Sequence, residues 1–220
     1  MKNIQFENLN LKPPLLKALS DIGYSIPTPI QGETIPEALK GSDILGMAQT
    51  GTGKTAAFIL PILQKLNANQ LENKFRDPRV LILAPTRELA IQINNSIRQY
   101  GKYIAFKHAV IFGGVKQGPQ VKLLNKGLDI IVATPGRLLD LINQGFTSLN
   151  KIEIFVLDEA DRMLDMGFIR DVEKIIKTLP RKRQTLFFSA TIPDNVVKLA
   201  GTILKFPKKI KVRSTLTPVE

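Results

Sequence analysis

The segment Ala48–Thr55 combines glycines, a lysine and a threonine in an order suited to holding phosphate groups. It reads Ala-Gln-Thr-Gly-Thr-Gly-Lys-Thr and stands between an apolar run, Asp43–Met47, and a predicted helix, Thr55–Leu66. Gly51 and Gly53 allow backbone angles that residues with a Cβ resist. Such a turn directs backbone N–H groups inward, and the helix that follows adds the positive end of its dipole. The segment therefore predicts a polyphosphate site.

Side chains of this loop add specific chemistry. Lys54 is expected to reach the β- and γ-phosphates, and the Thr55 hydroxyl is expected to ligate Mg²⁺. The general pattern is G-x-x-x-x-G-K-[ST], and Ala48 stands where its first glycine is expected. An ordinary glycine-rich turn between a strand and a helix is the alternative. The residues expected to hold the phosphates are Gln49, Thr50, Gly51, Thr52, Gly53, Lys54 and Thr55.

Two adjacent carboxylates, Asp158 and Glu159, end a second apolar run, Ile152–Leu157. A run that is apolar almost throughout is typical of a strand buried on both faces of a parallel sheet. Carboxylates are costly to bury without a cation, and the carboxyl ends of such strands are where ligands bind. We therefore assign Asp158 to the magnesium ion, through water, and Glu159 to orienting or deprotonating an attacking water. A solvated acidic turn is the alternative.

Composition restricts the class of protein. A chain of 220 residues forms one large domain or two small ones, and 44% of its residues are apolar. Its 31 basic and 19 acidic residues give a net charge of +12, which favours a polyanionic partner. The absence of cysteine excludes disulfides and thiolate zinc sites and suits a cytoplasmic location. No apolar run approaches the roughly 20 residues of a membrane helix.

Apolar runs alternate with helical patterns along the chain, which predicts an α/β fold with a mostly parallel sheet and helices on both faces. The single histidine, His108, opens one of the predicted strands, and we expect it to have a packing or surface role. The expected strands are Asp43–Met47, Val80–Ala84, His108–Phe112, Asp129–Ala133, Ile152–Leu157, Thr185–Ser189 and Lys209–Val212. Besides Thr55–Leu66, the expected helices include one from Pro13 to near Gly23, and Thr86–Tyr100, Gly136–Asn143, Arg170–Thr178 and Asp194–Thr202. The polar stretch Asn67–Pro78 predicts an exposed loop.

The segment Gly23–Gln31 contains residues that could recognise adenine. A glutamine such as Gln31 can pair with the N6/N7 edge of that base. Tyr24 and the upstream Phe6 could cover the base by stacking. On spacing alone, a plain helix start at Pro29 is the favoured interpretation.

Three turns that follow predicted strands are suited to a sugar–phosphate backbone. They are Pro85–Ala90, Gly113-Gly114 and Thr134–Arg137. Free N–H groups, bare glycine backbone and arginines at one sheet edge would form a track for a nucleic acid. Ordinary helix capping explains each turn taken alone. A further turn, Ser189–Thr191, carries hydroxyls that could bond the carboxylates of Asp158–Asp161, with a structural turn as the alternative.

The combination of these segments resembles the N-terminal RecA-like P-loop domain of DEAD-box RNA helicases. The family name spells out Asp158-Glu-Ala-Asp161, and the other segments occur in family order from Phe6 to about Val212. The resemblance implies ATP and Mg²⁺ as cofactors, with Gln31 selecting adenine and Phe6 and Tyr24 beside it. The residues it implies for catalysis and coupling are Lys54, Asp158, Glu159, Ser189 and Thr191. Those it implies for sequence-independent RNA contacts are Pro85, Thr86, Arg87, Gly113, Gly114, Thr134, Gly136 and Arg137.

The resemblance also implies a domain organisation. Residues 1–212 are expected to form the helicase ATP-binding domain, with the adenine motif at 6–31, and residues 213–220 to begin an interdomain linker. The family has a second RecA-like domain that is absent from this chain, so we expect a monomeric fragment with little ATPase or unwinding activity. RNA and the missing domain are its expected partners. A small-molecule kinase, a non-catalytic RNA-binding scaffold and a DNA helicase are the alternatives.

Overall fold

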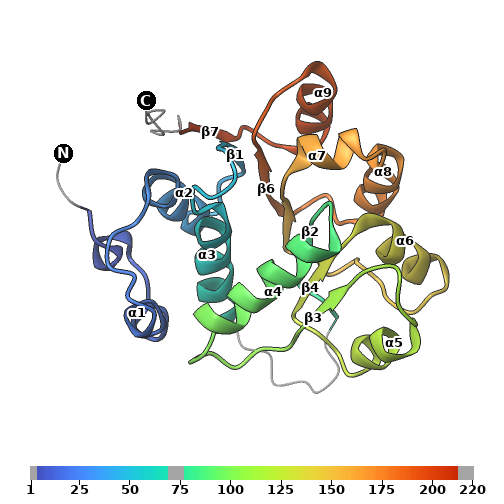
Figure 1. The fold of residues 1–220 in the computed structure, drawn as a ribbon, viewed down its shortest axis with the longest axis horizontal. Helices are drawn as coiled ribbons and strands as arrows, with labels where there is room; N and C mark the ends of the chain where they lie inside the picture. Colours follow the sequence, from blue (N-terminus) through green and yellow to red (C-terminus); the bar gives the residue numbers. More distant parts are fainter. Residues whose placement is uncertain (1–3, 69–76, 213–220) are drawn as a thin grey trace, which may run out of the picture.

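A single seven-stranded sheet organises the chain in a computed structural model that describes residues 4–68 and 77–212 (Figure 1). All neighbouring strands are parallel, in the order β3-β4-β2-β5-β6-β1-β7. The strands are β1 (Ile44–Met47), β2 (Val80–Leu83), β3 (His108–Ile111), β4 (Ile130–Ala133), β5 (Ile154–Leu157), β6 (Gln184–Ser189) and β7 (Lys208–Lys211). All seven predicted strands are present, with ends shifted by at most two residues.

Helices connect the strands and cover the sheet. A short 3₁₀ helix, η1 (Phe6–Leu9), precedes the α-helices. These are α1 (Pro13–Asp21), α2 (Pro29–Leu39), α3 (Lys54–Ala68), α4 (Arg87–Tyr100), α5 (Gly118–Asn125), α6 (Pro135–Asn143), α7 (Ala160–Asp165), α8 (Ile169–Thr178) and α9 (Asp194–Ile203). None of the helices in the described residues is both long and apolar enough to cross a membrane.

Two helices, α5 and α7, were not among the predicted elements, whereas α2 confirms the helix start at Pro29 that spacing alone favoured. In α5 the only buried residue is Gln120, and only Val121 and Leu124 pack partly on the core, so the apolar pattern of this eight-residue helix is weak. In α7 six residues form the whole helix, which is too short for a periodic pattern. The predicted loop Asn67–Pro78 lies mostly outside the described residues, and so does the predicted linker 213–220.

Each sheet face has its own apolar core. One core joins the sheet to the first four helices and includes Phe58, Ile82 and Ile93. The other joins the opposite face to α6, α8 and α9 and includes Leu83, Phe155 and Phe187. Strand β2 contributes alternate residues to the two cores and is buried at every position. This double burial explains why the strands read as continuous apolar runs.

The strand register brings the carboxyl ends of neighbouring strands to one edge of the sheet. Leu83 of β2 pairs with Ala133 of β4 and with Leu157 of β5. Met47 of β1 pairs with Ser189 of β6 in the same way. The segments that follow these strands therefore meet at this edge, and all the functional segments predicted from the sequence except Gly23–Gln31 are among them.

Candidate nucleotide site and nucleic-acid track

The phosphate loop is a tight turn between β1 and α3. Gly51 and Gly53 have φ angles of +80° and +94°, a region that residues with a Cβ rarely adopt. Helix α3 begins at Lys54, which places the free N–H groups and positive dipole end of the helix at the loop. The Lys54 side chain is buried, and its ammonium group donates a 2.7 Å hydrogen bond to the Ala48 carbonyl. This hydrogen bond joins Lys54, near the end of the loop, to Ala48 at its beginning.

A cavity of about 530 Å³ lies beside this loop, and residues from three segments of the chain surround it. Lys54 and Asp158, which are more than 100 residues apart, both line it. Gln49 and Thr52 do not, and the Thr52 hydroxyl donates to the Gln49 carbonyl within the loop. The lining residues are Thr50, Gly51, Gly53, Lys54, Thr55, Thr86, Glu88, Leu89, Gln92, Asp158, Glu159 and Arg162.

Asp158 is the most deeply buried acid of this cavity. Its side-chain oxygen Oδ1 accepts a 3.0 Å bond from the Glu159 amide. Burial raises the pKa of Asp158 to about 6; Glu159 and Asp161 add to this rise, whereas the charge of Lys54 opposes it. A divalent cation would stabilise the ionised carboxylate.

The donor groups fit a magnesium ion that takes further ligands from phosphate and water. Asp158 and the Thr55 hydroxyl offer hard oxygen ligands at the same cavity. Within residues 4–68 and 77–212 no group of three or more His, Cys, Asp and Glu side chains could hold a metal by itself. Magnesium sites that share substrate phosphates need only one or two protein carboxylates.

Glu159 lies in the left-handed backbone region, with φ and ψ both +52°. A residue with a Cβ loses roughly 1–2 kcal/mol in that region, so the surrounding fold must stabilise this turn. The Glu159 side chain is largely buried, and its Oε2 atom lies 3.2 Å from a guanidinium nitrogen of Arg162. The turn directs the carboxylate into the cavity next to Asp158.

The Ser189–Thr191 turn is bonded to the acidic turn. Both the Thr191 amide and its hydroxyl donate to Oδ2 of Asp161, each at 2.8 Å. The Ser189 hydroxyl accepts from the Asp161 amide and donates to the Thr191 carbonyl. Burial raises the pKa of Asp161, but the hydrogen bonds from Thr191 and Ser189 outweigh it and leave that pKa below its ordinary value. The carboxylate bonded by this turn is therefore Asp161 rather than Asp158.

Gln31 does not line the same cavity as the two aromatic residues predicted with it. Its Oε1 accepts from the Thr28 amide at 2.9 Å, and its Nε2 donates to the Gly53 carbonyl at 3.1 Å. The glutamine therefore connects the start of α2 to the phosphate loop. Contact with a base would require it to exchange these backbone bonds.

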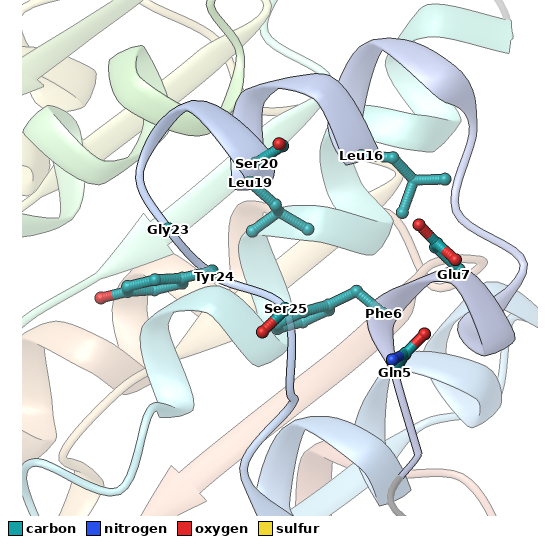
Figure 2. Close-up of a pocket in the computed structure, with 9 residues that line it drawn as sticks. All are labelled: Gln5, Phe6, Glu7, Leu16, Leu19, Ser20, Gly23, Tyr24 and Ser25. Atoms are coloured by element: carbon teal, nitrogen blue, oxygen red, sulfur yellow. The ribbon is translucent and has the colours of Figure 1, made fainter.

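Phe6 and Tyr24 lie together at a second cavity, of about 410 Å³ (Figure 2). Phe6 is almost fully buried and belongs to the core, whereas Tyr24 is about half exposed. The Phe6 amide donates to the Ser25 carbonyl at 3.1 Å, which fixes η1 against the segment before α2. Tyr24 is therefore the more accessible of the two rings for stacking.

The three turns of the predicted nucleic-acid track follow β2, β3 and β4, which are adjacent in the sheet. Arg137 donates two 3.1 Å bonds to the Val115 carbonyl and so connects the turns after β4 and β3. The Arg87 guanidinium lies 4.7 Å from the Phe112 ring centre. Gly113 and Gly114 have open space where a Cβ would project.

Two residues of these turns have structural roles. The Thr86 hydroxyl caps α4 by accepting from the Leu89 amide at 3.2 Å. Pro85 is buried. The remaining residues of this set, Arg87, Gly113, Gly114, Thr134, Gly136 and Arg137, are exposed or partly exposed along one edge.

Comparison with known proteins identifies the family. A family model described as DEAD/DEAH box helicase matches residues 28–199, which is most of the chain. This chain belongs to the DEAD/DEAH box helicase family. The RecA-like α/β fold expected from the sequence is confirmed by a DEAD box protein from the hyperthermophile Methanococcus jannaschii. It superposes with a TM-score of 0.87 at 40% identity, over 95% of this chain and 56% of that one.

Curated members of the DEAD/DEAH box helicase family are similar along almost the whole chain. Proteins named ATP-dependent RNA helicase DeaD from Klebsiella pneumoniae and Escherichia coli are 46% identical over 213 residues, or 96% of this chain. A protein named DEAD-box ATP-dependent RNA helicase 30 from Arabidopsis thaliana is 44% identical over 210 residues. The chain spans about a third of the length of these relatives.

Four cavity residues of this DEAD/DEAH box domain were missed from the sequence: Glu88, Leu89, Gln92 and Arg162. Glu88 and Gln92 are separated by one turn of α4, and Arg162 follows Glu159 by three positions. Helical spacing was the available signal, because residues i and i+3 or i+4 share a face. It could not show that this face meets the phosphate loop.

Proposed function

We propose that this chain is the ATP-binding motor domain of an ATP-dependent RNA helicase that remodels RNA duplexes. The observation that carries the proposal is the single cavity shared by Lys54, Thr55, Asp158 and Glu159 at the carboxyl edge of the sheet. Family membership and the names of the relatives support an RNA helicase within that class.

Each cavity residue has a proposed task. Lys54 exchanges the Ala48 carbonyl for the β- and γ-phosphates, and the loop amides bind the remaining phosphate oxygens. Thr55, directly, and Asp158, through water, hold the magnesium ion, which neutralises charge on the phosphates when bound. Glu159 orients the attacking water and accepts its proton.

Adenine recognition is proposed for Gln31 together with Tyr24 and Phe6. Gln31 already contacts the carbonyl of Gly53 in the phosphate loop. When its amide pairs with the adenine edge instead, the loop is released from that bond. Base recognition and loop conformation are therefore coupled in this proposal.

RNA contacts are proposed for the three turns after β2, β3 and β4, through phosphate and sugar groups and without base readout. Ser189 and Thr191 couple the nucleotide site to strand separation, since they bond Asp161 next to the catalytic acids. The residues proposed to line the RNA backbone are Pro85, Thr86, Arg87, Gly113, Gly114, Thr134, Gly136 and Arg137.

A second RecA-like domain is proposed as the partner that completes the ATP site with arginines. Arginine fingers contribute roughly 10³–10⁵-fold to phosphoryl transfer in NTPases. Residues 1–220 alone should therefore bind nucleotide and hydrolyse ATP very slowly, as a monomer. The cytoplasmic location expected from the sequence stays a prediction.

The proposal is tested by nucleotide binding and ATPase measurements on residues 1–220. Fluorescent ADP should bind in the presence of Mg²⁺, Lys54→Ala should abolish this binding, and Lys122→Ala on the surface of α5 should not affect it. ATP turnover should be slow with or without RNA, and covalent attachment of a second RecA-like domain should make it RNA-dependent. Robust RNA-stimulated turnover by the chain alone contradicts the expected inactivity, and phosphate transfer to a metabolite contradicts the helicase assignment.

A further inference from the structure

Strand β1 is incompletely covered on one face. It pairs with β6 on one side and β7 on the other, so its place in the sheet is internal. Strands β2, β4, β5 and β6 are buried at every position, whereas in β1 Leu45 and Met47 are only partly buried. Since side chains alternate between the two faces of a strand, these two residues share the incompletely covered face.

An apolar groove of about 310 Å³ lies over this face, between α9 and β7. Leu45 and Met47 form part of it, and Val197 of α9, about half exposed, contributes to its wall. Figure 1 shows β1 and β7 at one margin of the sheet. The groove is lined by Leu45, Met47, Ile192, Val197, Ala200, Gly201, Leu204, Pro207 and Lys209.

One lysine, Lys209, lines the groove, and further lysines lie near it. Lys209 is in register with Leu45, and Lys211 with Met47, so both lysines project from the face that carries the groove. Lys198 is exposed and follows Val197 in α9. Within the described residues none of these three lysines has an ion-pair partner, and no acidic side chain lines the groove. The groove therefore has an aliphatic floor and a positive edge on the β7 side, whereas α9 carries both the exposed Asp194 and Lys198.

We propose that this groove, formed by β1, β7 and α9, is a docking surface for an acidic amphipathic helix of a partner protein. A helix laid beside α9 would complete the helical layer that covers parallel sheets. Its apolar side chains would contact Leu45, Met47 and Val197, and its carboxylates would pair with Lys209 and Lys211 along the β7 side. The inference is independent of the proposed ATPase and RNA functions.

The lining favours a protein over RNA. Single-stranded RNA is held by aromatic side chains that stack on bases, and no aromatic residue lines this groove. Strands β5 and β6 also separate β1 from the turns of the proposed RNA track after β2, β4 and β3. The groove and the track are thus on different parts of the sheet edge.

The test selects ligands without assuming their sequence. A display library of random 16-residue peptides is selected on the chain, and each recovered peptide is measured by fluorescence anisotropy. We expect net negative peptides with apolar residues at positions i, i+3 or i+4, and i+7. Val197→Asp and Lys209→Glu should each weaken their binding at least tenfold. Leu123→Asp, at an exposed apolar position of α5, is the matched control and should have no effect.

Several outcomes would overturn the proposal. The selection could recover no peptide whose binding is weakened by Val197→Asp, or it could recover only basic or neutral peptides. An oligouridylate that displaces the recovered peptides would also overturn it. A concentration-dependent dimer that Val197→Asp abolishes would assign the groove to a second copy of the chain instead. Unchanged melting temperature and fluorescent-ADP binding of the variants would show that the fold and the nucleotide site are intact.

Discussion

Gly53 is the residue at which the phosphate loop tolerates least change. Its φ of +94° disfavours any side chain. A Cβ there would lie 2.5 Å from Nε2 of Gln31 and 2.9 Å from the Thr28 hydroxyl. The absence of a side chain therefore allows both the turn and the contact with Gln31.

Gly53→Ala and Gly51→Ala form a matched pair of variants. Gly51 has a similar φ of +80°, but a Cβ there meets nothing within 4 Å. Both variants should lose roughly 1–2 kcal/mol from backbone strain. Gly53→Ala should lose roughly 1–3 kcal/mol more from overpacking and should bind fluorescent ADP more weakly. Chemical denaturation measures the difference, and equal destabilisation of the two variants would contradict the contact.

Asp158 combines a destabilising charge with a proposed metal-binding role. Because its pKa is raised to about 6, the folded state binds more protons than the unfolded state between about pH 4 and 6. Stability from this group therefore falls as pH rises through that window, and the full cost is present above pH 7.

Asp158→Asn should make the ligand-free domain more stable at pH 8, by roughly 1–3 kcal/mol from a shift of about two pKa units. Stabilisation by Mg²⁺ and ADP together should be lost, since a neutral amide holds a magnesium-bound water less strongly than a carboxylate does. Melting temperatures from pH 5 to 8 check both effects, with Asp165→Asn on the surface as control. A variant less stable than the parent at pH 8 would show that burial is not the dominant cause.

At the scale of elements, the turns between strands and helices determine the chemistry. The turns after β3 and β4 connect through Arg137 and Val115, and Arg87 in the turn after β2 lies over the Phe112 ring next to the turn after β3. The turns after β5 and β6 connect through Asp161 and Thr191. The two groups are neighbours because β2 pairs with β5. The proposed RNA track is thus beside the candidate nucleotide site.

Arg87→Ala and Arg137→Ala should each weaken RNA binding to a similar extent for unrelated sequences. Each variant should also reduce the slope of log affinity against log salt concentration by about one, because one phosphate contact is lost. Arg98→Ala, an exposed arginine on α4, serves as control. A loss confined to one RNA sequence would indicate base readout and contradict a backbone track.

In the complete fold, the candidate nucleotide site is assembled from segments that are far apart in the chain. The phosphate loop follows β1, and the acidic turn follows β5, with β6 between them in the sheet. Any ligand that bridges the two segments binds only the folded state and must stabilise the entire domain.

Mg²⁺ and ADP at 100 times their dissociation constant should therefore raise the unfolding free energy by about 2.7 kcal/mol. ADP without magnesium should give a smaller rise, and Lys54→Ala should remove it. Thermal unfolding of the parent, with Lys122→Ala as control, measures the effect. A ligand-dependent shift retained in Lys54→Ala would place the nucleotide elsewhere.

Local sequence patterns were enough to predict the seven strands, the α/β class and the glycine turn that precedes α3. Continuous apolar runs such as Ile152–Leu157 and glycine turns such as that at Gly51 can be recognised within a short segment of sequence, without knowledge of what the segment packs against. Short or weakly apolar helices such as α5 and α7 lacked such a signal. Family resemblance added the roles that spacing could not give.

Contacts between side chains that are distant in the sequence became known from the folded structure. Strand order and register bring Asp158 to Lys54, direct Gln31 to the Gly53 carbonyl and attach Thr191 to Asp161 rather than Asp158. The uncovered face of β1 is another such property, since burial depends on which helices pack over a strand. Contacts between distant segments follow from the packing of the whole sheet, and a local sequence pattern does not encode them.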